Sequence, residues 1–555
     1  MDKFQMALVV AALFLVFILK GVYDKIAYKK KLRQKLETRF GQLPENSYDA
    51  ERYKYIGYYF EHKDHKNDVI DKITWNDLDM ELIFMMMNQT CSGIGEEYLY
   101  SLLHEPLFDD RERTERKQRI EYYEKHKENR EQTQMQLMQL GKMRKYSMYQ
   151  YIDLLRNAKS HKPYLNLFLC GCMILSIVLS IAVSPSFIGA VFVMMAVNII
   201  FYYKYDNRIY FESFGYAANL SKCAVRLSRM KLPVEKEQTE AFKKSAAKLE
   251  KLGKRAWMFR QGSAVGGTLT DLIMDYVKMI FHVDLIMFDM TLASMKKNDE
   301  ALRLVMDTLG EIDACIAIAS FRAMKEDYCC PEFTEKVILK AEGLYHPLIQ
   351  SPVKNDIKAL RGVLLTGSNA SGKSTFLKTV AINAIFAQTI CTVLAQSWTS
   401  SAFRVYSSMA LKDNIVENES YFIVEIKSLK RIISRCSEDI PMLCFIDEVL
   451  RGTNTVERIA ASSQILFRIS QANTLCFAAT HDIELTSVLE PYFDNYHFQE
   501  EVSDGQVTFD YRLRKGRAVS RNAIRLLGMI GFGEEIVEAA GRAGERFEKE
   551  GIWSL

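Results

Sequence analysis

A glycine-rich segment at Gly367–Thr375, which reads GSNASGKST, is the strongest candidate for chemistry in this sequence. The apolar run Val363–Leu365 before it has the character of a buried strand, and Thr375–Gln388 after it has the character of a helix. Glycines allow backbone amides to curl around phosphate groups, and the N-terminus of the helix adds a partial positive charge. The pattern predicts a phosphate loop composed of Gly367, Ser368, Asn369, Ala370, Ser371, Gly372, Lys373, Ser374 and Thr375.

Two side chains of this loop, and two that follow a later strand, are suited to phosphate and metal chemistry. Lys373 can reach the phosphates, and the Ser374 hydroxyl can ligate Mg²⁺. The apolar run Leu443–Ile446 ends in Asp447 and Glu448, about 75 residues beyond the loop. Acidic pairs are common at strand ends, but a phosphate loop needs a second strand end that holds Mg²⁺. Asp447 is therefore predicted to hold Mg²⁺ through water, and Glu448 to orient or deprotonate the attacking water.

A third apolar run, Leu475–Thr480, ends at His481. A single histidine is more often structural, so its weight comes from its place at the end of a third strand. In that position its ring can contact the γ-phosphate and report its presence. The three strand ends together predict one site that binds ATP with Mg²⁺.

The length and composition exclude several other kinds of site. With 555 residues, the chain is long enough for two or three domains. The 11 cysteines are scattered without a Cys-x-x-Cys pair, and the 9 histidines show no metal-ligand spacing, so we expect reduced thiols and no zinc site. The formal net charge of +4 is too small for this length to indicate nucleic-acid binding by itself.

Three segments are almost free of charge: residues 6–19, 165–183 and 186–203. A membrane-spanning helix needs about 20 apolar residues, and the second and third segments meet that need as a hairpin with a very short turn. The first is shorter, and a cleaved signal peptide is the alternative. The basic run Lys29–Lys35 follows it, which favours an uncleaved anchor whose cytoplasmic side lies at that run. The prediction is a multi-pass protein of the cell membrane with three spans, its N-terminus outside and its phosphate loop in the cytoplasm.

The spacing of the apolar residues divides the rest of the chain into two kinds of sequence. Charged, helix-like sequence precedes and follows the hairpin, whereas short apolar runs alternate with amphipathic helices from residue 338 onward. The first pattern predicts a mainly α-helical region, and the second predicts an α/β domain. The predicted domains are a transmembrane anchor (1–24), a first helical part (25–163), a transmembrane hairpin (164–203), a second helical part (204–337) and the α/β domain (338–555).

The motifs of the α/β domain resemble those of one family. The phosphate loop, ESYFIVEI at Glu419–Ile426, CFIDEVLRGT at Cys444–Thr453 and ATHD at Ala479–Asp482 are similar, in order and spacing, to the ATPase domain of MutS proteins. YHPLI at Tyr345–Ile349 resembles the segment that opens that domain. The resemblance implies an ABC/MutS-type P-loop ATPase domain at the C-terminal end.

The helical part resembles MutS proteins more loosely. TWNDLDMELIF at Thr74–Phe84, with Cys91–Leu103 after it, is similar to the start of the MutS lever domain. The segment Leu309–Phe333 resembles the helix that returns from the lever to the ATPase domain. The resemblance therefore implies a helical core or lever domain before the ATPase domain.

The family resemblance also implies a homodimer through the ATPase domain, with two composite sites. Ser420 falls where the family places a signature serine that touches the γ-phosphate bound by the opposite subunit, although Glu419 stands where many members have Arg. Arg517–Ala540 resembles the family's C-terminal helix-turn-helix (predicted at about 517–545), which in MutS proteins braces the dimer instead of reading DNA. The implied catalytic residues are Lys373, Glu448 and His481 of one subunit and Ser420 of the other.

Two departures from the family limit what the resemblance implies. Residues 1–73 hold a predicted span and a basic stretch instead of the mismatch-reading domain. The Phe-x-Glu motif of that domain occurs only at Phe333, Phe498 and Phe532, in the wrong region, so we expect no mismatch recognition through it. Basic residues between positions 243 and 260 could contact duplex DNA phosphates, anionic lipid head groups or only solvent.

The leading hypothesis is a membrane-anchored MutS-like ATPase. ATP binding and hydrolysis at a dimer interface would drive a clamp-like motion of the helical levers on a ligand such as duplex DNA. One alternative is a component of an ABC-type transporter, which three spans and the lack of an LSGGQ-type signature argue against. Another is a membrane scaffold without DNA binding, in which ATP acts as a slow switch.

Overall fold

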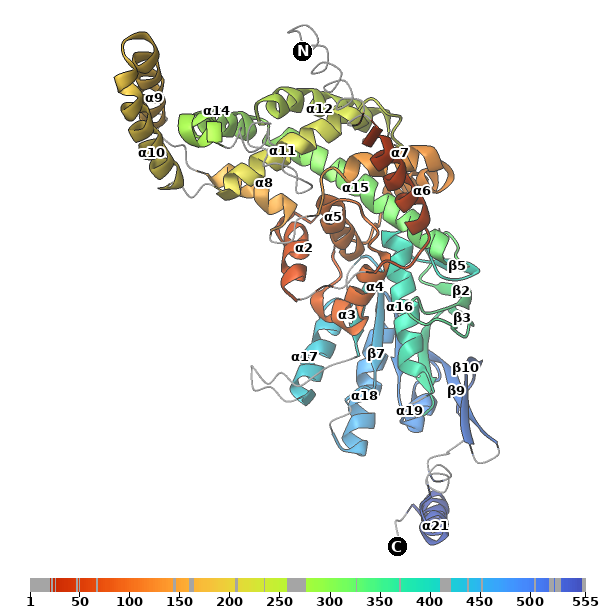
Figure 1. The fold of residues 1–555 in the computed structure, drawn as a ribbon. Helices are drawn as coiled ribbons and strands as arrows, with labels where there is room; N and C mark the ends of the chain where they lie inside the picture. Colours follow the sequence, from red (N-terminus) through yellow and green to blue (C-terminus); the bar gives the residue numbers. More distant parts are fainter. Residues whose placement is uncertain are drawn as a thin grey trace. The chain divides into compact units, whose positions relative to one another are not determined.

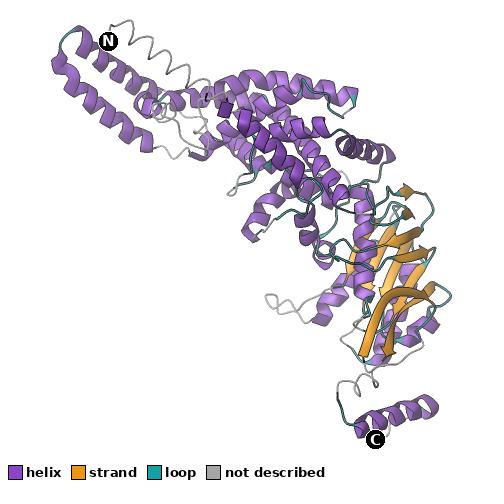
Figure 2. Ribbon diagram, turned by 45° about the vertical axis from the view of Figure 1, so that its right-hand side comes forward, coloured by secondary structure: helices purple, strands orange, loops and turns teal. Residues whose placement is uncertain are grey.

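The computed structural model contains two compact units (Figure 1). We call Met1–Asp64, Met85–Ser101 and Glu115–Met324 the helical unit, and His65–Phe84, Leu102–Thr114 and Lys325–Leu555 the α/β unit. All β-strands of the described residues lie in the α/β unit (Figure 2). The described residues are 20, 23–24, 26–45, 48, 50–65, 68–142, 146–158, 164–204, 208–233, 235–256, 276–325, 327–368, 371–409, 421–436, 439–450, 453–503, 506–518, 524 and 531–551.

The helical unit is a bundle of mostly amphipathic helices around a buried central one. Its helices are α2 (Ala50–His62), α7 (Lys127–Leu137), α8 (Met148–Asn157), α9 (Tyr164–Ala182), α10 (Ile188–Lys204), α11 (Arg208–Leu227), α12 (Lys236–Ala256), α14 (Val283–Lys297) and α15 (Asp299–Met324), with the 3-10 turn η1 (Pro185–Phe187). Three more helices cross the limits of its segments: α4 (Met80–Met87), α5 (Gly93–His104) and α6 (Asp110–Lys125).

The helix α15 forms the centre of this unit because most of its residues are buried. α11 and α12 pack against each other and against α15. Small side chains let them approach closely: a Cβ added to Gly253 would lie only 2.5 Å from Ser221 Oγ. The same hydroxyl donates a hydrogen bond of 2.6 Å to the Leu249 carbonyl, so the polar group in the contact is satisfied.

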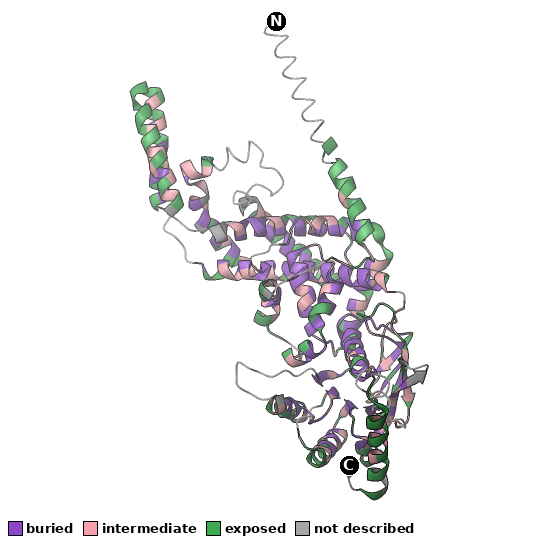
Figure 3. Ribbon diagram, turned by 60° about the horizontal axis from the view of Figure 1, so that its bottom comes forward, coloured by how far each residue is buried: buried purple, intermediate pink, exposed green. Residues whose placement is uncertain are grey.

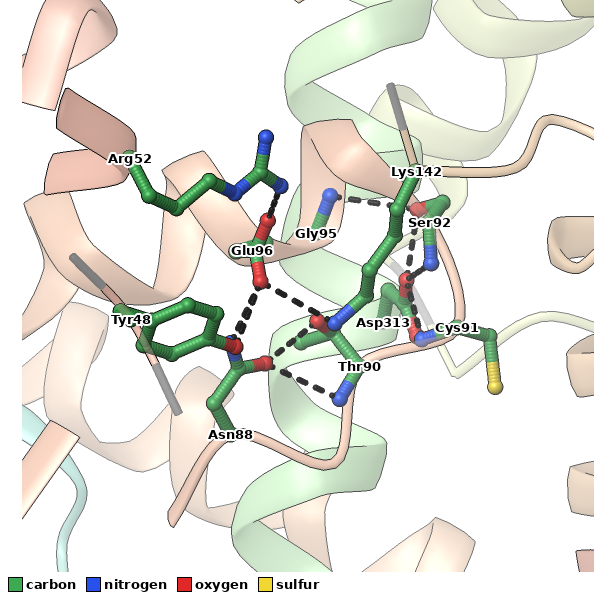
Figure 4. A network of polar contacts seen from close by, with 10 residues as sticks. All are labelled: Tyr48, Arg52, Asn88, Thr90, Cys91, Ser92, Gly95, Glu96, Lys142 and Asp313. Atoms are coloured by element: carbon green, nitrogen blue, oxygen red, sulfur yellow. Dashed lines mark hydrogen bonds and ion pairs between the residues drawn. The ribbon is translucent and has the colours of Figure 1, made fainter. Parts of the chain in front are cut away.

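A buried aspartate caps the N-terminus of α5 (Figure 4). Asp313 of α15 accepts hydrogen bonds from the backbone N–H groups of Cys91 and Ser92 and from the Ser92 hydroxyl, at 2.6–3.0 Å. Only glycine fits beneath this carboxylate, since a Cβ on Gly95 would lie 2.2 Å from Asp313 Oδ2. Burial raises the pKa of Asp313 to about 6, and the hydrogen bond from Ser92 limits the rise.

Glu96, in the first turn of α5, is the second buried carboxylate of this network (Figure 4). It accepts hydrogen bonds of 2.8 Å from Tyr48 and Asn88, and it forms ion pairs with Arg52 and Lys142. Burial alone would raise its pKa, but the two cations and the two hydrogen bonds together lower it. The network therefore keeps a charged carboxylate in the interior by surrounding it with donors.

The helices α9 and α10 form the predicted hairpin, with η1 in the turn (Figure 1). Each half, Tyr164–Ala182 and Pro185–Tyr203, is long and apolar enough to cross a membrane. Only 22% and 6% of the residues in their apolar windows are buried (Figure 3). The described residues thus contain two candidate spans instead of the expected three. The first predicted span, residues 6–19, lies outside the described residues, so the three-span topology stays a prediction.

The open end of the hairpin carries a polar contact with the segment before α14. His282 Nδ1 lies 3.1 Å from Asn166 Oδ1 of α9, and His282 Nε2 lies 2.9 Å from the Asn198 carbonyl of α10. Asn198 in turn donates a hydrogen bond of 2.7 Å to the Ile280 carbonyl. One histidine therefore joins both helices of the hairpin to the rest of the helical unit.

The α/β unit contains two sheets and the helices that cover them. The larger sheet has the order β10-β9-β4-β8-β7-β6 and the smaller one β1-β5-β2-β3. Its strands are β1 (Glu332–Phe333), β2 (Leu339–Leu344), β3 (Asn355–Ala359), β4 (Gly362–Thr366), β5 (Ser397–Ser400), β6 (Arg404–Ser408), β7 (Met442–Asp447), β8 (Thr474–Ala479), β9 (Phe493–Ser503) and β10 (Gln506–Lys515). Its helices are α3 (Lys72–Asp77), α16 (Lys373–Thr389), α17 (Tyr421–Ser434), α18 (Thr455–Ser470), α19 (Ile483–Val488) and α21 (Glu534–Glu550).

The central strands β4, β7 and β8 are the three apolar runs that the sequence predicts. They are buried along their length, and β4 pairs with β8 and β8 with β7 in parallel. Parallel strands that are buried on both faces consist of continuous runs of apolar residues, so they can be recognised in the sequence. Because the three strands are parallel neighbours, the residues that follow each of them meet at one edge of the sheet.

The segment that contains α3 covers the outer strand β6. The Asp77 carboxylate accepts hydrogen bonds from the Ser407 hydroxyl at 2.6 Å and from the Met409 N–H at 3.0 Å. Thr74 Oγ1 accepts a further hydrogen bond of 3.1 Å from the Ser407 N–H. These contacts satisfy polar groups at the edge of the sheet, where an uncovered strand would pair with other chains.

Candidate active site

The phosphate loop begins where β4 ends and finishes where α16 begins. Gly367 has a φ of 143° and Gly372 a φ of 101°, conformations that side chains with a Cβ rarely adopt. A Cβ on Gly367 would also lie 2.8 Å from Ser371 Oγ and 2.9 Å from the Phe498 carbonyl. Both glycines are therefore required by the backbone, as the predicted strand-loop-helix context implies. Asn369 and Ala370 of the predicted loop lie outside the described residues.

The side chain of Lys373 lies across this loop. Its Nζ donates hydrogen bonds to the carbonyls of Gly367 (2.7 Å) and Ser368 (2.8 Å) and lies 3.4 Å from His481 Nε2. Burial lowers the pKa of Lys373, and the nearby carboxylates of Asp447 and Glu448 oppose this effect. The ammonium group thus lies where the loop would hold phosphate, with acceptors on both sides of it.

Asp447 is the last residue of β7 and points toward the start of α16. The Ser374 hydroxyl is near enough to its carboxylate to lower the pKa of that group, whereas its Oδ1 is buried without a hydrogen-bond partner. Burial raises the pKa of Asp447, and the neighbouring Glu448 raises it further. A buried oxygen without a donor, beside a hydroxyl, is the ligand environment that Mg²⁺ prefers, so Ser374 and Asp447 fit that ion.

Glu448 and His481 form a pair at the ends of β7 and β8. His481 Nε2 lies 2.9 Å from Glu448 Oε1. The Glu448 N–H bonds the Ala479 carbonyl, and the Thr480 N–H bonds the Leu365 carbonyl, both at 3.0 Å. These backbone bonds link the three strand ends directly. A carboxylate held beside a histidine can orient a water molecule and accept its proton.

The structure therefore places four of the predicted residues together: Lys373, Asp447, Glu448 and His481. Ser374 joins them through Asp447. Ser420 lies outside the described residues, one position before α17 begins, so its contact with a second subunit stays a prediction.

Sequence reasoning missed a cavity of about 380 Å³ beside the loop. Gly372, Thr375 and Phe376 line it on the side of the loop, and aliphatic, polar and aromatic side chains, Phe498 and Tyr511 among them, line the rest. Phe376 and Phe498 meet edge to face with ring centroids 5.8 Å apart, and Tyr511 stands 3.2 Å from the position of a Cβ on Gly372. A cavity of this size, with aromatic side chains in its lining, could take a flat aromatic ring system attached to the phosphates.

Asn355 of β3 sets the position of Tyr511. Its side chain donates to the Tyr511 carbonyl at 3.0 Å and accepts from the Leu513 N–H at 2.7 Å. Tyr511 has a φ of 53° and sits in a bulge of β10 between Phe509 and Leu513. In the sequence Asn355 is only the polar first residue of the short strand β3, which does not reveal a partner 156 positions away.

Glu500 of β9 is a further buried carboxylate near the loop that the sequence did not reveal. It lies two positions after Phe498, on a strand that continues past the last residue of β4. Its Oε2 is buried without a hydrogen-bond partner, and its charge acts on Lys373.

Comparison with known proteins adds independent evidence on this part of the chain. Residues 363–548 match the family model described as MutS domain V. The DNA mismatch repair protein MutS of Thermus thermophilus is 30% identical over 250 residues, which cover 44% of this chain and 30% of that protein. The protein of the same name from Pseudothermotoga lettingae is 30% identical over 264 residues, covering 46% and 32%. That from Listeria welshimeri is 28% identical over 294 residues, covering 50% and 34%. The match thus spans about a third of the length of these relatives.

Proposed function

The chain belongs to the MutS family through its domain V, and from that premise we propose that it binds and hydrolyses ATP with Mg²⁺. The observation that carries the proposal is the meeting of a loop lysine with two acidic residues and a histidine at three adjacent strand ends. Phosphoryl transfer depends on positioning and on charge stabilisation, and these groups supply both.

Each of these residues has one task in the proposed reaction. Lys373 would exchange its two carbonyl partners for the phosphates. Glu448 would orient the attacking water and take its proton, while His481 holds the direction of that carboxylate. Bound Mg²⁺, held by Ser374 and by Asp447 through water, would neutralise charge on the phosphate oxygens. The aromatic cavity beside Gly372 would take the adenine ring.

ATP turnover by the purified full chain tests this proposal. Glu448→Gln keeps the shape and the hydrogen bond to His481 but cannot accept a proton, so turnover should fall while ATP still binds. Glu335→Gln, an exposed change in the same unit, is the control. Normal hydrolysis by Glu448→Gln would remove Glu448 from the role of general base.

We propose further that the working form is a homodimer and that its ligand is duplex DNA. The relatives named DNA mismatch repair proteins support the choice of DNA as the first ligand to test. The exposed lysines of α12, Lys243, Lys244, Lys248 and Lys251, offer charge for phosphate contacts without base readout. Turnover and binding with and without duplex DNA, over a range of salt, test it. A DNA effect that is absent at low salt would exclude DNA as the ligand, since such contacts weaken steeply as salt rises.

The hairpin favours a membrane location for this ATPase. α9 and α10 expose large apolar side chains, including Phe168, Ile181 and Ile200, at 66%, 82% and 69% exposure. Such a surface is unfavourable in water and favourable in lipid. Membrane fractionation of the full chain, and of a variant that lacks residues 164–203, tests this. Recovery of the full chain from the soluble fraction without detergent would contradict a membrane location.

A further inference from the structure

The loop that carries Glu448 is held in an unusual backbone conformation. Glu448 and Leu450 both have a φ of 57°, in the left-handed region. Residues with a side chain enter this region at an energetic cost, and they persist there only when the surroundings hold them. The direction in which Glu448 points therefore depends on the contacts that hold this loop.

Two of these contacts come from the core of the sheet and from α18. The Glu448 N–H bonds the Ala479 carbonyl at the end of β8. Ser462 of α18, which is fully buried, donates its hydroxyl to the Val449 carbonyl at 3.2 Å. Ala479 belongs to β8 and Ser462 to α18, which packs against β8, so both partners fix the loop to the core of the unit.

The third contact comes from α17. Glu425 is buried, and its carboxylate accepts a hydrogen bond from the Leu450 N–H. Leu450 is itself buried in the apolar cluster between α17, α18 and the sheet. Glu425 is only the fifth residue of α17, so its Cα lies about 6 Å along the axis from the first.

We propose that Glu425 is a positioning residue that couples the N-terminus of α17 to the direction of Glu448. The proposal rests on the dimeric ATPase proposed above, in which Ser420, directly before α17, would face a nucleotide held by a second copy of this chain. A contact there would shift the first turn of α17. The shift reaches Leu450 through one hydrogen bond and Glu448 through two peptide units, so each site senses whether the opposite site is filled.

The chemistry of the contact explains why a carboxylate is suited to it. A carboxylate makes a stronger hydrogen bond to a backbone N–H than a neutral acceptor does. The bond is buried, so its loss leaves the Leu450 N–H without a partner and removes support from a strained loop. Other members of the unit cannot replace it, because Ser462 and Ala479 hold Val449 and Glu448 but not Leu450.

Kinetics of the full chain test this proposal. Glu425→Ala should lower kcat roughly 10- to 100-fold, because a misdirected catalytic group has an effect of this size, while ATP affinity stays unchanged. Glu425→Gln, whose amide oxygen still accepts from Leu450, should retain most of kcat. Glu335→Gln should behave as the wild type. The thermal unfolding midpoint is measured for every variant.

A double-mutant cycle with Ser420→Ala separates coupling from a purely structural role. If Glu425 transmits the contact made at Ser420, the two losses in log kcat are not additive. Additive losses, or an unchanged kcat in Glu425→Ala, would overturn the proposal. If Glu425→Ala does not fold, Glu425→Asp, which shortens the side chain by one methylene, takes its place in the cycle. A wild-type chain that does not hydrolyse ATP would instead refute the proposed ATPase.

Discussion

The helical unit and the α/β unit both bury aspartates, but they surround them differently. Asp313 in the helical unit accepts hydrogen bonds from two backbone N–H groups and one hydroxyl (Figure 4). Asp447 in the α/β unit has a hydroxyl beside it and one oxygen buried without a partner. Burial raises the pKa of both. The first is satisfied by its own chain, whereas the second is satisfied only if something else binds.

This difference separates a structural carboxylate from a candidate ligand. Hydrogen bonds from the chain make a buried carboxylate part of the fold, and their loss costs stability. A buried carboxylate oxygen without a hydrogen-bond donor lowers the stability of the fold. A protein retains such an oxygen where it binds a ligand or takes part in catalysis. Matched Asp→Asn substitutions at the two positions should therefore have opposite effects on folding and on turnover.

The largest effect is expected from Asp447→Asn. Loss of the charge that holds Mg²⁺ should lower kcat roughly 10²- to 10³-fold, the effect typical of one preorganised electrostatic group. Thermal unfolding should stay unchanged or move to a higher temperature, because a neutral amide is cheaper to bury than a carboxylate. Turnover assays and calorimetry measure the two quantities. A large loss of stability would mean that Asp447 is a structural carboxylate like Asp313, and it would contradict the distinction between the two.

Asp313→Asn should have the opposite signature. It puts an amide donor against the N–H groups at the start of α5, so the free energy of unfolding should fall by about 2–4 kcal/mol. Denaturant unfolding followed by circular dichroism measures this change, and ATP affinity should be retained. Glu300→Gln, an exposed change on the same helix, is the control. Lost ATP affinity in a folded Asp313→Asn chain would contradict a purely structural role.

Glu97, which follows Glu96 in α5, should sharpen the comparison through the pH dependence of the stability of the fold. Burial raises its pKa from 4.5 to about 8, despite hydrogen bonds from Ser147 and Met148. Between these pH values the folded chain holds a proton that the unfolded chain has lost, so stability should fall as pH rises through this window. Glu97→Gln should remove at least about 1 kcal/mol of this pH dependence. Unfolding between pH 5 and 8 measures it, and an unchanged slope would contradict the prediction.

The smallest effect is expected at the cavity. Tyr511→Ala should weaken ATP binding by about 1 kcal/mol, the value of one aromatic contact, with little change in kcat. Tyr511→Phe keeps the ring and should bind ATP as the wild type does. Titration with a fluorescent ATP analogue measures the affinity. Equal weakening by both variants would mean that the hydroxyl, and not the ring, makes the contact.

The residues at the centre of the candidate site could be picked out from the sequence for a physical reason. The strand-loop-helix around Gly367–Thr375 and the acidic pair after β7 are local patterns, because the chemistry needs residues adjacent in the chain. The hairpin of α9 and α10 was also predicted, since span length depends only on a run of apolar residues. His481 was placed by its order after a third strand, and the parallel neighbours β7 and β8 bring it to Glu448.

The sequence could not predict what depends on residues far apart. Tyr511 reaches the cavity because Asn355, on another strand, holds a bulge in β10. Glu425 of α17 bonds Leu450, 25 positions away in the loop after β7, and no periodicity in the sequence indicates this contact. The segment that contains α3 joins the α/β unit through Asp77 and Ser407, which are 330 positions apart.

The sequence by itself determined which groups could do the chemistry and in which order they follow the strands. Glycine, lysine, aspartate and glutamate at those places are required by phosphate and Mg²⁺, whatever else the chain does. The tertiary structure decided which buried carboxylates accept hydrogen bonds from their own chain and which keep an oxygen without a donor. That distinction depends on where donors from distant segments come to lie in space, and local sequence carries no record of it.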